Sequence, residues 1–267
     1  MRDIVRQIVN VIGTVLLITV NVLANTLPLN GLNTGEFSDR FDVYFVPAGY
    51  VFAIWGLIYV ALAAFTVYQA LPSQRENPHL RRIGYLYALS CVANVAWLFL
   101  WHYEQFVWTL AAMLPLLVLL IAIYLRLRIG RLRVPPAETW LVHVPFSIYL
   151  GWITVATIAN VTQVLDFVNW SGWGLAAEWW AIIMLVVGGV VASLVSLTRG
   201  DVAYVLVIVW AFAGIVVKQS DTLSVAITAG VVAGLVLLTL IIGLPLRQER
   251  LQKRQVRYIE GGIRDRW

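Results

Sequence analysis

PAGYVFAIWGLIY, residues 47–59, is the stretch of sequence that decides the fold. Its proline and glycine suit the first turn of a helix, where a backbone amide proton has no acceptor within the helix. The apolar run then continues to Leu71. Trp55 and Tyr59 are four residues apart and therefore lie on one face of that helix. Each is a large ring with a polar atom, at a depth where membrane helices usually carry plain aliphatic side chains.

Two later apolar stretches carry the same kind of residue. Residues 94–97 read NVAW, and residues 149–160 read YLGWITVATIAN. Three apolar helices thus each contain a deep tryptophan, which indicates a pocket between them. The alternative is that these rings only pack between helices, since a large ring buries much area anywhere.

Polar and small residues accompany the two later tryptophans at helical spacing. Asn94 and Trp97 share one face, and Trp152, Ala156 and Asn160 share another. The small side chain of Ala156 leaves the room that a flat ring system requires. Amides at membrane depth must be paired, so Asn94 and Asn160 either hydrogen-bond across helices or face the polar edge of a ligand.

The composition is that of a membrane protein. Hydrophobic residues make up 61% and charged residues 12% of the chain, about half the charge of a soluble domain. Mean hydropathy is +0.82. The net charge of +5 does not indicate nucleic-acid binding, because the basic residues flank apolar spans. The single cysteine, Cys91, lies inside an apolar run and excludes a disulfide within the chain.

Eight apolar segments are long enough to cross a bilayer core of ~30 Å. They lie at residues 8–26, 47–71, 83–102, 106–125, 139–161, 175–197, 202–217 and 222–244. With the N-terminus inside, every lysine and arginine except Arg40 and Lys218 falls on the inner side, as the positive-inside rule requires. We therefore expect an all-α, multi-pass protein of the cell membrane with eight transmembrane helices and both termini cytoplasmic.

Three segments leave alternatives open. The first span could be a cleaved signal peptide, although it is long for one. The external loop at residues 27–46 is either a functional loop or a solvated connector. Gly188-Gly189 and the Gly230-x-x-x-Gly234 motif allow close helix contact, within the chain or in a homodimer.

These residues resemble the TspO/MBR family, the tryptophan-rich sensory proteins related to the mitochondrial translocator protein. In that family, helix two ends in W-x-x-L-Y, helix three carries N-x-x-W, and helix five carries W-x-x-x-A-x-x-x-N. Trp55 and Tyr59, Asn94 and Trp97, and the series from Trp152 to Asn160 match in order. The resemblance implies a five-helix bundle over residues 1–163. Three additional helices over 164–246 and a basic cytoplasmic tail over 247–267 would follow.

The resemblance also implies a ligand site between helices one, two, three and five. We assign it to Trp55, Tyr59, Asn94, Trp97, Trp152 and Ala156, and add Asn160 from its spacing. The implied ligands are planar and hydrophobic: tetrapyrroles such as protoporphyrin or haem, or sterol-like lipids. The implied role is sensing, sequestration or transfer. Apart from such a bound porphyrin or haem, we expect no cofactor.

Motifs of hydrolases, kinases and metal enzymes do not occur in the sequence. His102 and His143 are expected at opposite ends of the fold, where they cannot share a metal. No carboxylate is expected at the membrane midplane, which disfavours a proton pump. Light-driven porphyrin breakdown is a proposed activity of the family, but no residue here requires it, and we expect no enzyme.

Two other classes of function are compatible with the sequence. In a small-molecule permease the eight helices would line a path and the tryptophans would only pack. In an assembly factor the additional helices would dock a partner protein. The sequence also allows a homodimer, and the expected partners otherwise are the bilayer and a hydrophobic small molecule.

Overall fold

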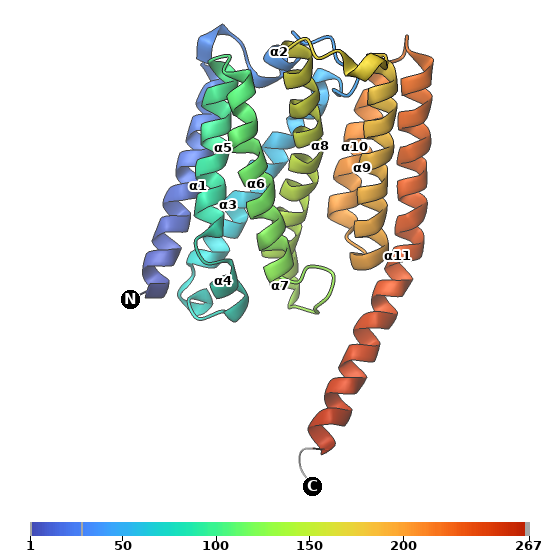
Figure 1. Ribbon diagram of the computed structural model, residues 1–267. Helices are drawn as coiled ribbons and strands as arrows, with labels where there is room; N and C mark the ends of the chain where they lie inside the picture. Colours follow the sequence, from blue (N-terminus) through green and yellow to red (C-terminus); the bar gives the residue numbers. More distant parts are fainter. Residues whose placement is uncertain (1, 28, 265–267) are drawn as a thin grey trace.

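The computed structural model describes residues 2–27 and 29–264, with side chains through Lys253, and within these ranges it is helical without strands. Eight helices stand side by side in one bundle (Figure 1). They are α1 (Arg2–Thr26), α3 (Ile54–Ala70), α5 (Leu86–His102), α6 (Phe106–Arg126), α8 (Val144–Phe167), α9 (Ala177–Arg199), α10 (Val202–Lys218) and α11 (Leu223–Arg264).

Short helical segments connect them. Those at the end where α1 finishes are η1 (Leu29–Gly31), α2 (Thr34–Ser38), η2 (Gly49–Ala53) and η5 (Gly172–Gly174). Those at the opposite end are η3 (Pro72–Gln74), α4 (Pro78–Ile83), α7 (Pro136–Glu138) and η4 (Thr139–His143). We call the end that carries α2 the lid end, because α2 covers a cavity there. We call the opposite end the basic end, because lysine and arginine side chains gather there.

The predicted all-α, multi-pass architecture is confirmed. Six of the described helices are long and apolar enough to cross a membrane, and α5 and α10 are apolar helices of 17 residues each. Each of the eight predicted spans therefore corresponds to one helix of the bundle. Helices α5 and α10 are slightly shorter than the length of about 20 residues that an untilted helix needs to cross a membrane.

Helix boundaries differ from the predictions at three places. The stretch at residues 47–59 begins as the 3₁₀ segment η2, so α3 starts only at Ile54. Helix α1 begins at Arg2, because its first residues bond to α4 and the η3 region. Helix α11 continues to Arg264, through part of the predicted tail. The predicted basic tail also includes the residues from Arg254 to Trp267, and their side chains lie outside the described part of the structure.

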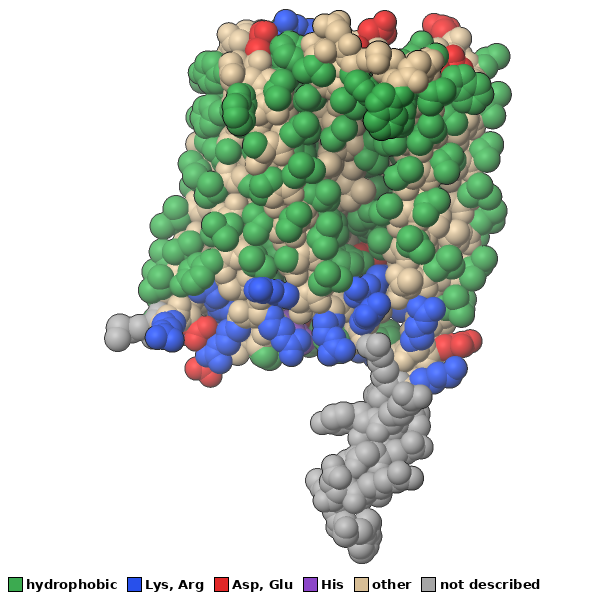
Figure 2. All heavy atoms as spheres, in the orientation of Figure 1, with side chains coloured by type: hydrophobic (Ala, Val, Ile, Leu, Met, Phe, Trp, Pro, Cys, Tyr) green, Lys and Arg blue, Asp and Glu red, His purple; other side chains and the backbone are tan. Residues whose placement is uncertain are grey.

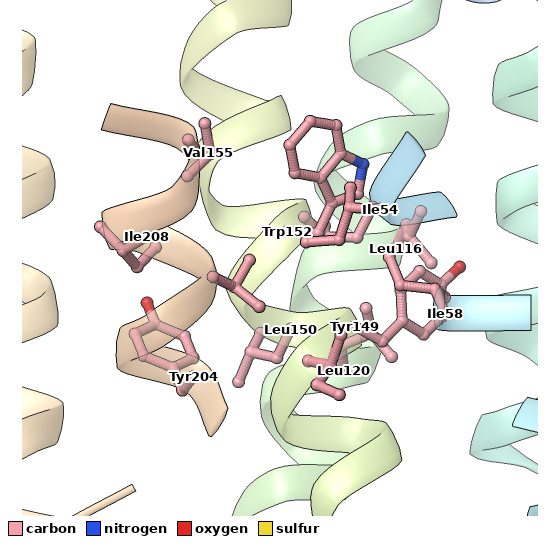
Figure 3. Close-up of a cluster of buried hydrophobic side chains, with 14 of the residues drawn as sticks. Ile54, Ile58, Leu116, Leu120, Tyr149, Leu150, Trp152, Val155, Tyr204 and Ile208 are labelled. Carbon is pink, nitrogen blue, oxygen red and sulfur yellow. The ribbon is translucent and has the colours of Figure 1, made fainter. Parts of the chain in front are cut away.

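Helix α8 is the central element. Its apolar part is mostly buried, whereas the corresponding parts of α1, α3, α6, α9 and α11 are about one-third buried. It packs against α3, α6 and α10. Figure 3 shows the core around it, where Tyr149 and Trp152 of α8 lie among Ile54 and Ile58 of α3 and Leu116 of α6.

Helix α8 also connects the first five spanning helices to the last three. A Cβ atom at Gly151 would lie 3.1 Å from both the Tyr204 carbonyl oxygen and Val207 Cβ of α10, so a larger residue here would require α10 to move slightly away. Buried Asp201, between α9 and α10, accepts hydrogen bonds from Tyr124 Oη of α6 at 2.8 Å and Ser147 Oγ of α8 at 2.6 Å. Burial raises the pKa of the Asp201 carboxyl, and these donors partly offset that rise.

Two carboxylates lie near the starts of helices yet are buried. Asp201 and Glu138 are both buried, and Glu138 bonds to His79 and Asn77. Both lie toward the basic end, so the midplane itself remains without a described buried carboxylate.

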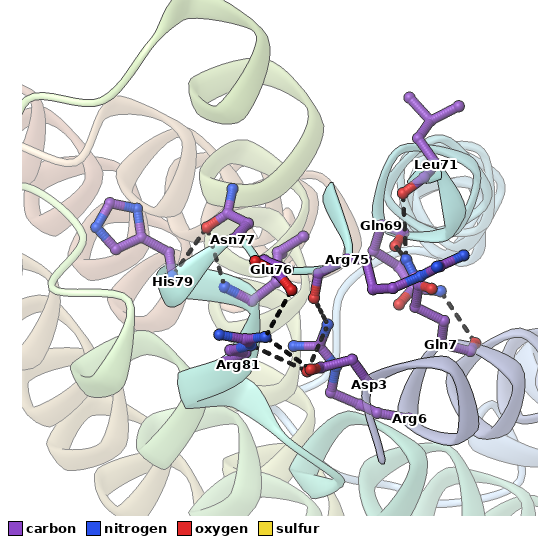
Figure 4. Close-up of polar contacts among 11 residues, drawn as sticks. Asp3, Arg6, Gln7, Gln69, Leu71, Arg75, Glu76, Asn77, His79 and Arg81 are labelled. Carbon is purple, nitrogen blue, oxygen red and sulfur yellow. Dashed lines mark hydrogen bonds and ion pairs between the residues drawn. The ribbon is translucent and has the colours of Figure 1, made fainter. Parts of the chain in front are cut away.

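Lysine and arginine side chains gather at the basic end, below the apolar belt of the bundle (Figure 2). Figure 4 shows part of this end, where Arg81 pairs with Asp3 at 2.7 Å and Arg6 donates to the Arg75 carbonyl oxygen at 2.9 Å. The basic residues that were used to predict the topology are thus concentrated at one end of the folded bundle. Which side of a cell membrane this end faces stays a prediction.

Candidate functional site

A small enclosed cavity lies under α2 at the lid end. Its free volume is about 30 Å³, room for one or two water molecules. Residues from α2, η2, α3, α5 and α8 line it. They are Thr34, Ser38, Pro47, Phe52, Trp55, Trp97, Trp101, Trp152, Val155, Ala156, Ala159, Asn160 and Gln163.

Aromatic rings form most of its wall. Trp152 makes edge contacts with Trp55 at 6.1 Å and with Phe52 at 5.7 Å between ring centroids. On the opposite helix, Trp97 and Trp101 stack at 5.6 Å with their planes only 16° apart. Edge and stacked contacts of this kind are the favourable geometries of aromatic pairs. The rings therefore present both faces and edges to the cavity.

Asn160 pairs across helices. Its side-chain carbonyl oxygen accepts the indole N–H of Trp97 at 3.2 Å, and its amide nitrogen donates to Thr109 Oγ1 at 2.8 Å. Trp152 Nε1, by contrast, is buried and has no hydrogen-bond partner in the described chain. A buried donor without an acceptor carries a desolvation cost of about 1–3 kcal/mol. A water molecule or a ligand oxygen in the cavity would remove that cost.

Tyr59 and Asn94 do not line the cavity. They lie in a polar cluster with Asn21 of α1, which accepts the Tyr59 hydroxyl at 2.8 Å and donates to Asn94 Oδ1 at 2.9 Å. Asn94 Nδ2 and the hydroxyl of neighbouring Tyr149 remain without partners. The structure therefore brings five of the seven predicted residues together at the cavity wall. Trp55 stacks on Tyr59 at 5.6 Å and connects the cavity to this cluster.

The polar cluster is one end of a longer buried seam along α1, which was not predicted. Gln7, Asn10, Thr14 and Asn21 are all buried on one helix face. Their partners come from α3 and α5, and include Gln69, whose backbone oxygen accepts from Gln7 Nε2 at 2.7 Å (Figure 4). The spacing of these polar residues within a span was the signal that would have revealed the seam.

Helix α2 forms a lid over the cavity. Asn33 caps it through a complete capping box with Glu36, which explains why so short a helix forms. Below it, Ser38 Oγ accepts from Gln163 Nε2 at 2.7 Å and the Thr34 carbonyl oxygen accepts from Trp101 Nε1 at 3.3 Å. The lid is thus bonded to residues of the cavity wall itself.

His102 holds the lid from α5 and is fully buried. Its Nδ1 lies 3.0 Å from the Leu29 carbonyl oxygen, which can only accept, so Nδ1 carries the proton. In the neutral ring Nε2 then accepts the Thr34 hydroxyl, at 3.1 Å. The sequence did not reveal this burial, which arises because the loop at residues 29–38 folds back over the end of α5.

Two ion pairs hold the outer side of the lid. Arg40 Nη1 lies 2.8 Å from Glu104 Oε1, and Lys218 Nζ of α10 lies 2.6 Å from Asp39 Oδ1. The second pair connects the last three helices directly to the lid. Trp210 of α10 adds a hydrogen bond of 3.2 Å to the Val51 carbonyl oxygen in η2.

Trp101 is the wall residue that sequence reasoning missed. It lies near the end of the predicted span at residues 83–102 and was not included in the predicted site, yet it is only 2% exposed. The spacing of four residues from Trp97 would have placed the two rings on one face. Its burial depends on the lid, which no helix pattern in the sequence predicted.

Metal chemistry has no support in the described part of the chain. No group of three or more histidine, cysteine, aspartate or glutamate residues could hold a metal ion there. His102 at the lid end and His143 near Glu138 at the basic end are far apart along the bundle, as predicted. What the cavity offers is apolar ring surface together with the buried, unpaired N–H donor of Trp152.

Comparison with known proteins gives one match. The profile of a family described as TSPO-like protein matches residues 7–242, which spans all eight helices of the bundle. No curated protein and no solved structure matches the chain. The match confirms the resemblance found in the sequence, and it extends past residue 163 into the last three helices. The chain therefore belongs to the TSPO-like family and is a multi-pass membrane protein of the ligand-binding and sensory type that this family represents.

Proposed function

We propose that the chain binds a planar hydrophobic ligand in the cavity under the lid and acts in sensing, sequestration or transfer. Candidate ligands are tetrapyrroles, such as protoporphyrin or haem, and sterol-like lipids. The observation that carries the proposal is the convergence of four tryptophans from three helices on one buried cavity: Trp55, Trp97, Trp101 and Trp152. Ligand pockets combine such apolar and aromatic walls with a few polar groups.

The cavity must open to take such a ligand. Drug-sized ligands occupy pockets of about 300 to 1,000 Å³, and the free volume here is about 30 Å³. The cavity wall must therefore move before a ligand of that size can enter. The small residues Ala156 and Ala159 on one wall and the short lid on another are where space can be created.

Polar groups at the wall would orient the ligand. Trp152 Nε1 is a free buried donor at the cavity, and Asn94 Nδ2 and Tyr149 Oη are free one layer deeper. A carboxylate or hydroxyl at the edge of the ligand would accept from the first of these. This gives the ring system a preferred direction of entry.

The test is a titration of purified protein with protoporphyrin, followed by tryptophan fluorescence. Trp152→Phe removes the free donor, and Trp55→Phe trims the facing wall. We expect saturable quenching in the unaltered chain, with a dissociation constant about tenfold higher in Trp152→Phe, the equivalent of one hydrogen bond. The matched control is Trp108→Phe, since Trp108 is 65% exposed on the outside of the bundle.

Linear quenching that is identical in all variants would contradict the proposal, because it would mean that the porphyrin only partitions into the detergent. A haem or sterol titration with the same variants would then decide between the ligand classes.

In the cell, we propose that the protein lies in the cell membrane with the basic end and both termini in the cytoplasm, which the distribution of basic residues supports.

A small-molecule permease is the second candidate, and the buried polar seam favours it. The seam runs from Gln7 and Gln69 at the basic end to Asn21 and Asn94 below the cavity. Polar side chains in spanning helices mark substrate paths in many transporters. Substrate flux in proteoliposomes that is lost in Asn21→Leu but kept in Trp152→Phe would support this candidate over the binding function.

A further inference from the structure

A second and larger cavity lies at the lid end, between the five-helix part and α9. It is separated from the first cavity by α8 and has a free volume of about 410 Å³. The chain segment at residues 42–45, the end of α8, the η5 turn and the start of α9 enclose it. Its volume falls in the range of about 300 to 1,000 Å³ that small-molecule sites occupy. No part of the function proposed above uses it.

Tryptophans form one wall of this cavity. Trp170 and Trp180 both line it, with their ring centroids 5.1 Å apart. Trp180 is fixed by a hydrogen bond of 2.9 Å from its Nε1 to the Gly172 carbonyl oxygen. A third ring, Trp173, packs on both at 5.3 and 5.8 Å. An interfacial aromatic belt explains an exposed ring such as Trp173, but not the pair of Trp170 and Trp180 on one cavity wall.

The turn that presents these rings is strained. Asn169 and Trp173 have φ of 52° and 53°, which side chains rarely adopt, and Gly172 and Gly174 are also left-handed. For a bulky residue such as Trp173 this conformation costs energy that the rest of the fold must offset. Strained turns of this kind occur at ligand sites more often than in plain connectors.

Two carboxylates lie at the same cavity. Asp42 and Asp166 both line it and are near enough for their charges to interact. Neither has an ion-pair partner among the described side chains. Asp42 also faces a neighbouring depression with Lys218 and Arg40, but those cations bind Asp39 and Glu104. An uncompensated pair of carboxylates beside aromatic faces is the arrangement that attracts a cation.

The surrounding surface has the same sign of charge. Figure 2 shows acidic side chains at the lid end, in contrast to the basic end. Only Arg40 and Lys218 offset the acidic residues there, and both are already paired. The acidic residues are Glu36, Asp39, Asp42, Glu104, Asp166, Glu178 and Asp221. Cations are therefore concentrated at the mouth of this cavity.

We propose that this cavity binds an organic cation with an apolar substituent, such as a quaternary ammonium compound. The cationic head would lie between Asp166, Asp42 and the faces of Trp170 and Trp180. The apolar part would pack on Leu165 and Met184 of α8 and α9. This site is independent of the planar ligand in the first cavity.

The test is calorimetric titration of the protein in nanodiscs of zwitterionic lipid with benzyltrimethylammonium. We expect saturable binding that is about tenfold weaker in Asp166→Asn and about fivefold weaker in Trp180→Leu. The uncharged carbon isostere, with a tert-butyl group in place of the trimethylammonium, is expected to bind at least tenfold more weakly than the cation.

Two matched variants control for general effects. Asp221→Asn removes the same charge from the same end without touching the cavity, and Trp179→Leu removes the exposed neighbour of Trp180. Both are expected to bind the cation as the unaltered chain does. Equal affinity for the cation and its isostere, or equal losses in Asp166→Asn and Asp221→Asn, would overturn the proposal.

Discussion

The first five spanning helices and the last three have different interiors. Among α1, α3, α5, α6 and α8, buried amides, hydroxyls and indoles bond across helices, as Asn21 and Asn160 do. Between α9 and α11 the hydrogen bonds lie at the exposed ends, and in the buried middle aliphatic side chains pack while glycines allow the backbones to approach. A Cβ at Gly243 would lie 2.9 Å from the carbonyl carbon of Ser196, against the backbone of α9.

This difference indicates that the two regions have different roles, ligand recognition in the first and mechanical support in the second. Directional hydrogen bonds and large rings line a space that can recognise a ligand. Some of the polar atoms that line it have no hydrogen-bond partner within the protein. Close apolar packing offers no recognition, yet it gives a rigid body, because van der Waals contact is lost as soon as a gap forms. The last three helices contact the lid through Lys218 and the neighbouring η2 segment through Trp210.

The largest effect is expected where the close packing is broken. Gly243→Ala would push a methyl group into the backbone of α9, and we expect the free energy of unfolding to fall by about 1–3 kcal/mol. Gly234→Ala, in the same helix, meets no atom within 4 Å and should be neutral or stabilising by up to about 1 kcal/mol. Thermal unfolding in detergent measures both. Similar losses in the two variants would contradict steric fit as the basis of this region.

A smaller effect is expected in the hydrogen-bonded region. Asn21→Leu leaves the Tyr59 hydroxyl and Asn94 Oδ1 without their partner, and we expect it to destabilise the fold by about 1–2 kcal/mol. The control is Asn25→Leu, one turn further along α1, where the side chain is exposed. The same unfolding assay applies. An unchanged midpoint in Asn21→Leu would show that the seam does not stabilise the bundle.

The smallest effect on stability is expected at the ion pair between the two regions. Lys218→Met removes the contact with Asp39, which is worth about 0–1 kcal/mol at an exposed position. Local opening of the lid should nevertheless increase several-fold, measured as faster hydrogen exchange over residues 34–42. Asp39→Asn should have the same effect, and the double variant should add nothing further. Additive effects would mean that the two side chains act separately.

Much of the fold could be predicted because the ends of membrane-spanning helices are encoded in the local sequence. Apolar length and flanking charge are properties of the sequence, and each of the eight predicted spans has its helix. The 3₁₀ start at η2 and the long continuation of α11 could not be predicted in this way. They depend on contacts made elsewhere, such as the hydrogen bond from the Ala48 amide to the Gly214 carbonyl oxygen at 3.1 Å.

The candidate site was only partly predictable. Helical spacing correctly grouped Trp152, Ala156 and Asn160, since spacing is a local property. It did not separate Tyr59 and Asn94 from the cavity, because depth along the bundle depends on how neighbouring helices are shifted against each other. The burial of Trp101 and His102 was not predicted either, because it involves the folded-back loop, to which both side chains bond.

The sequence by itself determined that this is an all-α membrane protein of eight spans, with one basic end and with tryptophans inside its first five helices. Length, hydropathy and charge suffice for that, because each acts on one helix at a time. Only the tertiary structure decided which rings share a cavity, that α10 braces the lid, and that a second cavity lies beyond α8. These features arise from the relative positions of helices far apart in the chain, which no local pattern records.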